Sequence, residues 1–116
     1  MKGGFMNRIQ IYDIRLLKML VSTNKEAIST DVTHIQAKME VNYDFCKKEK
    51  NFTYLIHVND ANNQELYEIV LQYHFLINEE DFLDQDIVEQ FLDEMQPRLE
   101  TILTIVAYES GFSKLS

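Results

Sequence analysis

The segment IQAKMEVNYDF, residues 35–45, alternates apolar and polar side chains without a break. Its apolar positions are Ile35, Ala37, Met39, Val41, Tyr43 and Phe45. This period of two is typical of a β-strand that buries one face. The same alternation returns over residues 67–77, whereas after Asp84 the apolar spacing becomes helical and holds almost to the C-terminus. Strands followed by a helix predict an α+β fold, in which an antiparallel four-stranded sheet carries a helix on one face.

Outward from this segment, turn-rich stretches divide the rest of the sheet into strands. The first strand is expected over residues 6–21, and it is irregular. Its apolar phase slips at Tyr12-Asp13, where an extra residue would make a β-bulge, and slips again at Leu16-Leu17. A helix over residues 14–21 is the competing interpretation, because the leucines and basic residues there are good helix formers. The other strands are expected over residues 32–46, 52–58 and 66–78, with the first hairpin turn over residues 47–51.

The C-terminal helix is expected to begin with Asp84 as its N-cap. Pro97 should break or kink it, because proline has no backbone N–H to donate. Beyond the proline, apolar side chains cover an arc of roughly 200°, wider than the ~100° stripe of a surface helix. Gly111 suits the position that follows a helix end. The residues expected to pack on the odd positions of the second and fourth strands are Leu99, Ile102, Leu103 and Val106.

Length and composition limit the class of protein. The 116 residues fit a single domain over residues 1–116, and a hydrophobic content of 46% excludes a disordered chain. No apolar run reaches the roughly 18 residues of a membrane span, and the N-terminus lacks the apolar stretch of a signal peptide. The single Cys46 agrees with the cytoplasmic location that these features predict. A net charge of −8 argues against a nucleic-acid partner.

No group of residues has the spacing of a catalytic or metal site. His34, His57 and His74 fall on three different predicted strands and are interpreted as solvated or half-buried histidines. The acidic residues 79–86 lack the glycine and fixed ligand spacing of a calcium loop. Cys46 lies in no setting that marks a catalytic nucleophile. We therefore expect no enzymatic activity, no cofactor and no bound metal.

Aromatic side chains gather near the ends of adjacent predicted strands. They could form part of the core or the floor of an apolar groove. Val70 and Leu76 lie on the opposite face of the fourth strand, so this sheet is partly apolar on both faces. A second apolar face needs cover from a partner subunit or a bound chain. The aromatic residues are Tyr43, Phe45, Phe52, Tyr54, Tyr73 and Phe75.

The order of elements resembles the bacterial export chaperone SecB. Residues 96–102, QPRLETI, resemble the proline-x-leucine stretch inside that family's first helix. Residues 110–115, SGFSKL, resemble the glycine, aromatic and leucine that follow it, and residues 8–14, RIQIYDI, resemble the first strand with its charged break. The chain has Thr101-Ile102 in place of the family's second proline and tyrosine, and Ser113 in place of a later proline. It also ends before the family's last helix, and so resembles the shortened SecB-like domains of Gram-positive bacteria.

The resemblance implies a chaperone that holds non-native polypeptide without ATP and passes it to a translocase motor or another protein. Together with the aromatic density, it indicates a set of residues that contact the unfolded client. These residues are Tyr43, Phe45, Tyr54, Phe75, Leu76 and Phe112.

The wide apolar face of the helix also predicts a homo-oligomer, a dimer or a tetramer, which uses this face and the free edge of the sheet. The expected interface residues are Leu99, Ile102, Ile105 and Val106. Two alternatives stay open. One is a structural, homo-oligomeric adaptor that binds one folded protein partner. The other is a small apolar-ligand binder with a pocket between sheet and helix, and the size of the cavity under the helix discriminates it from the rest.

Overall fold

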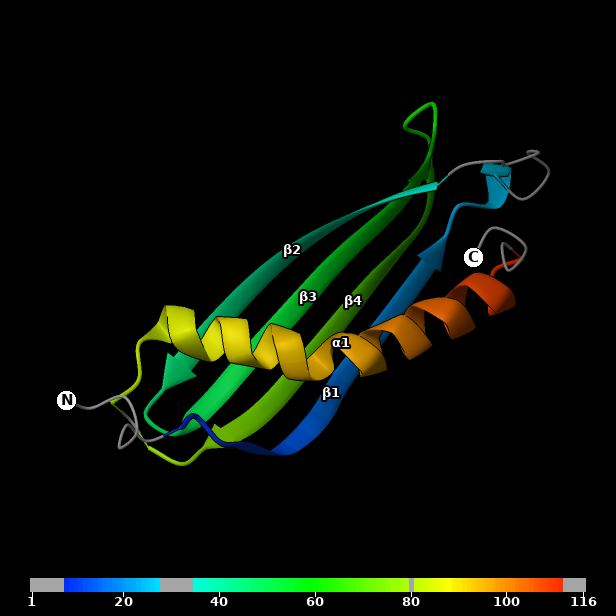
Figure 1. Ribbon diagram of the computed structural model, residues 1–116. Helices are drawn as coiled ribbons and strands as arrows, with labels where there is room; N and C mark the ends of the chain where they lie inside the picture. The colour runs from blue at the N-terminus through cyan, green and yellow to red at the C-terminus, as the bar shows by residue number, and fades with distance from the viewer. Residues whose placement is uncertain (1–7, 28–34, 80, 112–116) are drawn as a thin grey trace.

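The computed structural model describes residues 8–27, 35–79 and 81–111. A four-stranded antiparallel sheet forms one layer and a single C-terminal helix, α1, crosses one of its faces as the second layer (Figure 1). The α+β class is therefore confirmed. The elements, in chain order, are β1 (Ile11–Thr23), the short 3-10 turn η1 (Lys25–Ala27), β2 (Ile35–Cys46), β3 (Glu49–Asp60), β4 (Glu65–Ile77) and α1 (Asp84–Glu109).

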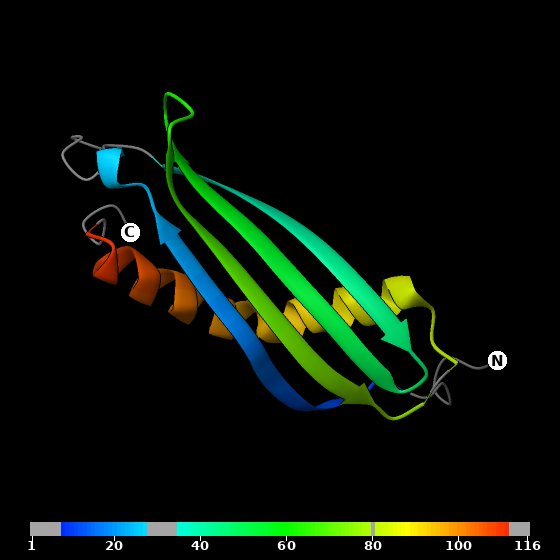
Figure 2. The same ribbon diagram turned by 180° about the vertical axis from the view of Figure 1, so that it is seen from behind.

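The strand order in the sheet is β1-β4-β3-β2. Strands β2, β3 and β4 form a meander, and β1 pairs antiparallel with β4, so β1 and β2 are the two edges. The first hairpin turn is tighter than expected, since β3 already begins at Glu49. Seen from behind, no element of the described chain lies over the face opposite α1 (Figure 2).

Residues 14–21 belong to strand β1 and do not form the competing helix, as the sequence favoured. The strand is irregular where the apolar phase slips. Its register with β4 shifts between Tyr12 and Arg15 and again between Leu16 and Lys18. Asp13 adopts a positive φ of 55° at the first shift. Extra residues at both points bend the strand and increase its twist, which confirms the predicted bulge.

Helix α1 differs from the prediction at its start and at its proline. Leu83, not Asp84, is the N-cap, and it makes no side-chain capping hydrogen bond. The helix also runs without a break through Pro97. Proline removes the N–H that would bond the carbonyl of Asp93, and both residues are exposed, so solvent can satisfy that carbonyl. At the other end, Gly111 has a φ of 88°, as expected for the residue after a helix end.

The core lies between α1 and the even positions of β3 and odd positions of β4. Phe91 is at its centre, and its ring stacks on Phe75 at a centroid distance of 4.2 Å and an interplanar angle of 10°. Leu99 and Val106 are buried in the same core, and Ile102 and Leu103 pack half-buried against it. The second half of the helix therefore packs on the sheet, as its apolar spacing predicted.

Candidate binding surface

The diagonal path of α1 leaves part of the helix-bearing sheet face without cover (Figure 1). On β2, Ile35, Met39 and Tyr43 share that face but keep 36%, 47% and 47% of their surface exposed. We call these three residues the β2 ridge. Val41 and Phe45, between and beyond them, do pack against the core. The ridge is therefore an apolar strip on an edge strand that α1 leaves largely exposed.

A small apolar cavity lies between the start of the ridge and α1. Its volume is about 120 Å³. Sites for drug-sized ligands are typically about 300–1,000 Å³, so this cavity fits one side chain better than a separate small molecule. Its lining residues are Ile35, Ala37, Val58, Tyr67, Leu103, Thr104 and Ala107.

A line of aromatic rings joins the other end of the ridge to the core. The rings of Tyr43 and Phe45 have centroids 4.5 Å apart, and Phe45 meets Phe75 edge-on at 6.1 Å. The ammonium of Lys50 lies over the Phe45 ring, 5.1 Å from its centroid, and donates to the carbonyl of Lys47. These contacts hold the ring of Phe45 in place, and the ring of Tyr43 packs against it.

The six predicted client contacts do not form one surface. Tyr54 and Phe75 are fully buried core residues, with 0% exposure. Leu76 is half-buried on the opposite face of the sheet, where it pairs with Tyr12. Tyr43 is exposed and Phe45 half-buried at the ridge, and Phe112 lies outside the described residues. The period of two identifies residues that share a face, but it does not show which of them the helix covers.

Three buried tyrosines, Tyr54 on β3 and Tyr67 and Tyr73 on β4, belong to the core of the sheet. Burial, with Tyr73 nearby, raises the pKa of Tyr54 far above its ordinary value. Burial also raises the pKa of Tyr67 and of Tyr73, and the charge of Arg98 partly offsets the shift at Tyr73. The hydroxyl of Tyr54 has no hydrogen-bond partner among the described residues. These groups stay neutral in the folded protein and belong to the core rather than to a reactive site.

The predicted interface residues also divide between core and surface. Leu99 and Val106 retain 7% and 4% exposure and pack in the chain's own core, so they are closed to a partner. Ile102 is half-buried, and Ile105 is 54% exposed on the outer side of α1. Of the four, Ile105 is the residue most open to another subunit.

The free edge strand β1 carries the largest run of exposed apolar side chains in the described chain. Leu16, Leu17, Met19, Leu20 and Val21 are each between 41% and 56% exposed. Met19 and Val21 pair with Leu71 and Ile69 on the helix-bearing face, and Leu20 pairs with Val70 on the other. None of these residues was predicted to bind a partner from the sequence, and of the ridge only Tyr43 was. The near-continuous apolar run over residues 16–21 was the available signal.

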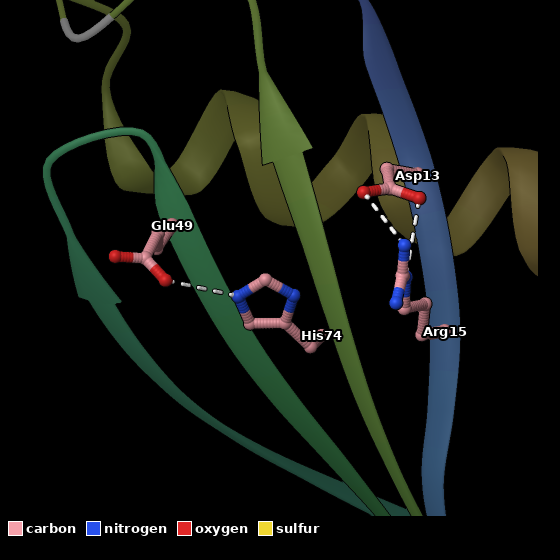
Figure 3. Close-up of polar contacts among 4 residues, drawn as sticks. All are labelled: Asp13, Arg15, Glu49 and His74. Carbon is pink, nitrogen blue, oxygen red and sulfur yellow. Dashed lines mark hydrogen bonds and ion pairs between the residues drawn. The ribbon is translucent and has the colours of Figure 1, made fainter.

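The face opposite α1 carries polar pairs. His74 Nε2 lies 3.4 Å from Glu49 Oε1, and Arg15 Nε donates to Asp13 Oδ1 at 3.2 Å beside the β1 bulge (Figure 3). His74 and Arg15 are register partners on neighbouring strands. The structure thus brings charged groups, not a continuous apolar surface, to this end of the outer face.

Comparison with known proteins relates the fold to one class. The chain matches a solved structure of a Mycobacterium tuberculosis protein with a TM-score of 0.54 and 14% sequence identity, covering 89% of this chain and 83% of that one. The sheet and helix therefore define a SecB-like fold. The matched protein is the Rv1957 SecB-like chaperone, in complex with a ChAD peptide from the Rv1956 HigA1 antitoxin. No protein-family model matches the sequence, and no curated protein matches it either.

In the described part of the chain, α1 is the one long helix, and it is not apolar enough to cross a membrane.

Proposed function

We propose that this protein is a binding module for extended, apolar segments of polypeptide, with no catalytic step. The observation that carries the proposal is the β2 ridge, an apolar strip left uncovered on an edge strand. An edge strand offers unpaired backbone groups to an added chain, and the alternate side chains of that chain can then pack on the ridge. The SecB-like fold, found in a chaperone solved with a bound peptide, supports the same function.

The length of the ridge sets the length of the segment. Ile35 and Tyr43 are separated by about 26 Å along the strand at ~3.3 Å per residue. A bound segment would therefore need about ten extended residues with apolar side chains on one face. The cavity of about 120 Å³ beside Ile35 would accept one of these side chains. The client is thus defined by its apolar pattern and extended form.

A peptide-binding titration tests the proposal. Labelled ten-residue peptides with alternating apolar residues should bind the wild-type protein. The substitution Met39→Asp places a charge in the ridge and should raise the Kd at least tenfold, about 1.4 kcal/mol. Asn42→Asp is the matched control, because it adds the same charge on the opposite face of the same strand. Equal loss of affinity in both variants, or no peptide binding at all, would refute the ridge as the site.

A client-aggregation assay separates this function from that of an adaptor for one folded protein. The wild-type protein should delay light scattering by a reduced, unfolded client, and the native form of that client should not compete. Competition by a folded protein, with no effect on aggregation, would favour the adaptor. Transfer to a translocase motor, the export step that the family resemblance implies, is tested by client release when the motor is added to the preformed complex.

We also propose a homo-oligomer that forms through the edge of β1. The exposed apolar residues between Leu16 and Val21 support it, because an unpaired apolar edge readily pairs with another strand. A second copy of the chain would satisfy the free backbone groups and cover side chains on both faces of the strand. The outer side of α1 near Ile105 is the alternative contact.

A further inference from the structure

A histidine and two glutamates meet on the face opposite α1, away from the β2 ridge. Nδ1 of His57 lies 3.0 Å from Glu65 Oε1 and 3.2 Å from Glu68 Oε2. His57 comes from β3, and both glutamates come from the start of β4. The side chains are 31%, 48% and 33% exposed, so the group is partly screened from solvent but open to an ion.

A local irregularity of β4 brings the two glutamates together. Residues 65 and 68 would point to opposite faces of a regular strand, because side chains alternate. The register between β3 and β4 shifts here, so that Val58 pairs with Tyr67 while Asn59 pairs with Glu65. Leu66 and Tyr67 are consecutive and both buried, which turns Glu65 to the same face as Glu68. The extra residue thus re-aims a carboxylate toward His57.

The segment after β1 holds this irregularity in place. Asn24 N–H donates to the carbonyl of Leu66 at 2.9 Å, and Asn24 Nδ2 donates to the carbonyl of Glu65 at 2.8 Å. The backbone that carries Glu65 is therefore hydrogen-bonded to the segment that follows β1, and His57 lies on the central strand β3. A site built on tied backbone loses little conformational entropy when it binds a ligand.

The geometry suits a small divalent cation. In zinc sites, nitrogen and oxygen ligands lie about 2.0–2.2 Å from the metal, so tetrahedral neighbours are about 3.4 Å apart. His57 Nδ1 lies 3.0 Å from one carboxylate oxygen and 3.2 Å from the other, and the three atoms lie within 4.8 Å of one another. A small outward movement of these side chains would admit the ion. When the imidazole of His57 is neutral, at most one proton, on Nδ1, lies between the carboxylates of Glu65 and Glu68. The two negative charges then repel each other. A divalent cation in place of the proton would neutralise both.

We propose that His57, Glu65 and Glu68 form a binding site for a divalent transition-metal cation such as Zn²⁺, with solvent in the remaining position. One imidazole nitrogen and two carboxylate oxygens favour zinc over magnesium or calcium, which prefer an all-oxygen shell. The site is independent of the peptide-binding function, since it lies on the other face of the sheet. Lys38 of β2 is the register partner of His57 on that face, and its positive charge should weaken the binding of a cation there.

Isothermal titration with zinc chloride tests the site. All variants should carry Cys46→Ser, because the exposed thiol of Cys46 could bind zinc by itself. We expect one zinc per chain, a rise in melting temperature that a chelator reverses, and a much weaker response to magnesium. His57→Ala should weaken zinc binding at least 100-fold, and Glu65→Gln or Glu68→Gln at least tenfold. Lys38→Met should strengthen binding.

His74→Ala is the matched control, because His74 lies on the same face and, among the described residues, has one carboxylate within ion-pair distance, Glu49 at 3.4 Å. It should leave the zinc affinity unchanged. Imidazole ¹H–¹⁵N spectra of the intact protein should show zinc-dependent shifts at His57 and not at His74, which gives a readout even if a variant fails to fold. No binding at 1 mM zinc, or the same affinity in His57→Ala as in the parent, would overturn the proposal.

Discussion

At the scale of single residues, the described part of the core contains a buried side-chain oxygen without a hydrogen-bond partner, the hydroxyl of Tyr54. The ring of Tyr54 packs against the rings of Phe52, Tyr73 and Phe91, and no described residue forms a hydrogen bond with its buried hydroxyl. A buried hydroxyl without a partner costs about 1–3 kcal/mol of desolvation. The aromatic packing around the ring offsets this cost, since aromatic pairs contribute about 0.5–1.5 kcal/mol each beyond area burial.

Removing this hydroxyl should stabilise the protein. Tyr54→Phe keeps the ring and its contacts, so we expect the free energy of unfolding at pH 7 to rise by about 1 kcal/mol. Tyr54→Ala should lower it by about 3–5 kcal/mol, because it leaves a cavity. Urea denaturation followed by circular dichroism measures both. A loss of stability in Tyr54→Phe would show that the hydroxyl has a partner in solution.

The buried tyrosines also predict how stability depends on pH. Burial raises the pKa of Tyr54, Tyr67 and Tyr73 in the folded state above their ordinary value of 10.0. Their contribution to stability is therefore complete below about pH 10, where the unfolded phenols begin to ionise, and falls as the pH rises further. The urea midpoint should therefore drop as the pH rises above about 10, less steeply in Tyr54→Phe than in the wild-type protein. Tyr108→Phe is the control, because that ring is 70% exposed, and an identical slope in both variants would contradict the prediction.

At the scale of the element, α1 has a buried side that holds the sheet and an exposed side that does not. Ile87, Phe91, Met95, Leu99 and Val106 face the sheet, whereas Pro97 and Ile105 face solvent. This division explains why one helix can contain a proline and continue. The hydrogen bond that Pro97 cannot form lies on the exposed side of the helix. Packing of the buried side against the sheet keeps the two halves in one continuous helix.

Truncation on the two sides of the helix should lower the free energy of unfolding by very different amounts. Leu99→Ala removes a side chain that is 7% exposed, and should lower the free energy of unfolding by about 3 kcal/mol. Ile105→Ala removes one that is 54% exposed, and should change stability by less than about 0.5 kcal/mol. Chemical denaturation of both variants at a concentration that favours the monomer measures the difference. Equal losses would mean that the exposed side of α1 is also packed.

Replacing the proline should strengthen the helix. Pro97→Ala restores an N–H that can bond the carbonyl of Asp93, and proline inside a helix costs about 3 kcal/mol relative to alanine. Part of that cost is already relieved by solvent, so we expect a gain of about 1–2 kcal/mol with a rise in helical circular dichroism. A destabilised Pro97→Ala variant would show that the proline fixes a bend that the core requires.

At the scale of the whole molecule, the two edges of the sheet differ in character. β1 is apolar on both faces, which suits a permanent interface, whereas β2 is apolar only on the helix-bearing face. The ridge on β2 therefore remains open to a client if a second subunit covers β1. The edge at β1 would form the contact between subunits, and the edge at β2 would bind the client.

Sedimentation measures this assembly. We expect the wild-type protein to exceed the 13.7 kDa mass of one chain at micromolar concentration. Charges on an edge strand oppose strand pairing, so the double variant Met19→Lys, Val21→Lys should sediment as a monomer with its secondary structure intact. Ile105→Lys should leave the assembly unchanged. Dissociation by Ile105→Lys instead would place the interface on the outer side of α1.

By itself, the sequence determined the elements and their local irregularities. The apolar periods predicted all four strands and the helix, the two phase slips located the shifts in β1, and Gly111 marked the helix end, because each depends on neighbouring residues along the chain. The prediction that Pro97 breaks or kinks the helix was wrong, because whether a proline interrupts a helix depends on what the rest of the helix packs against. It also placed the N-cap one residue too late, at Asp84 instead of Leu83, because capping geometry depends on the loop that enters the helix.

Only the tertiary structure decided which apolar residues stay exposed and which distant groups meet. Ile35, Met39 and Phe45 follow one alternation, yet the crossing angle of α1 covers Phe45 more fully than the other two. Tyr54 and Phe75 were predicted to contact a client and are core for the same reason. Glu65 reaches His57 only because β4 gains a residue against β3. The helix angle and the register between β3 and β4 depend on contacts between residues far apart in the chain, so no local sequence pattern predicted them.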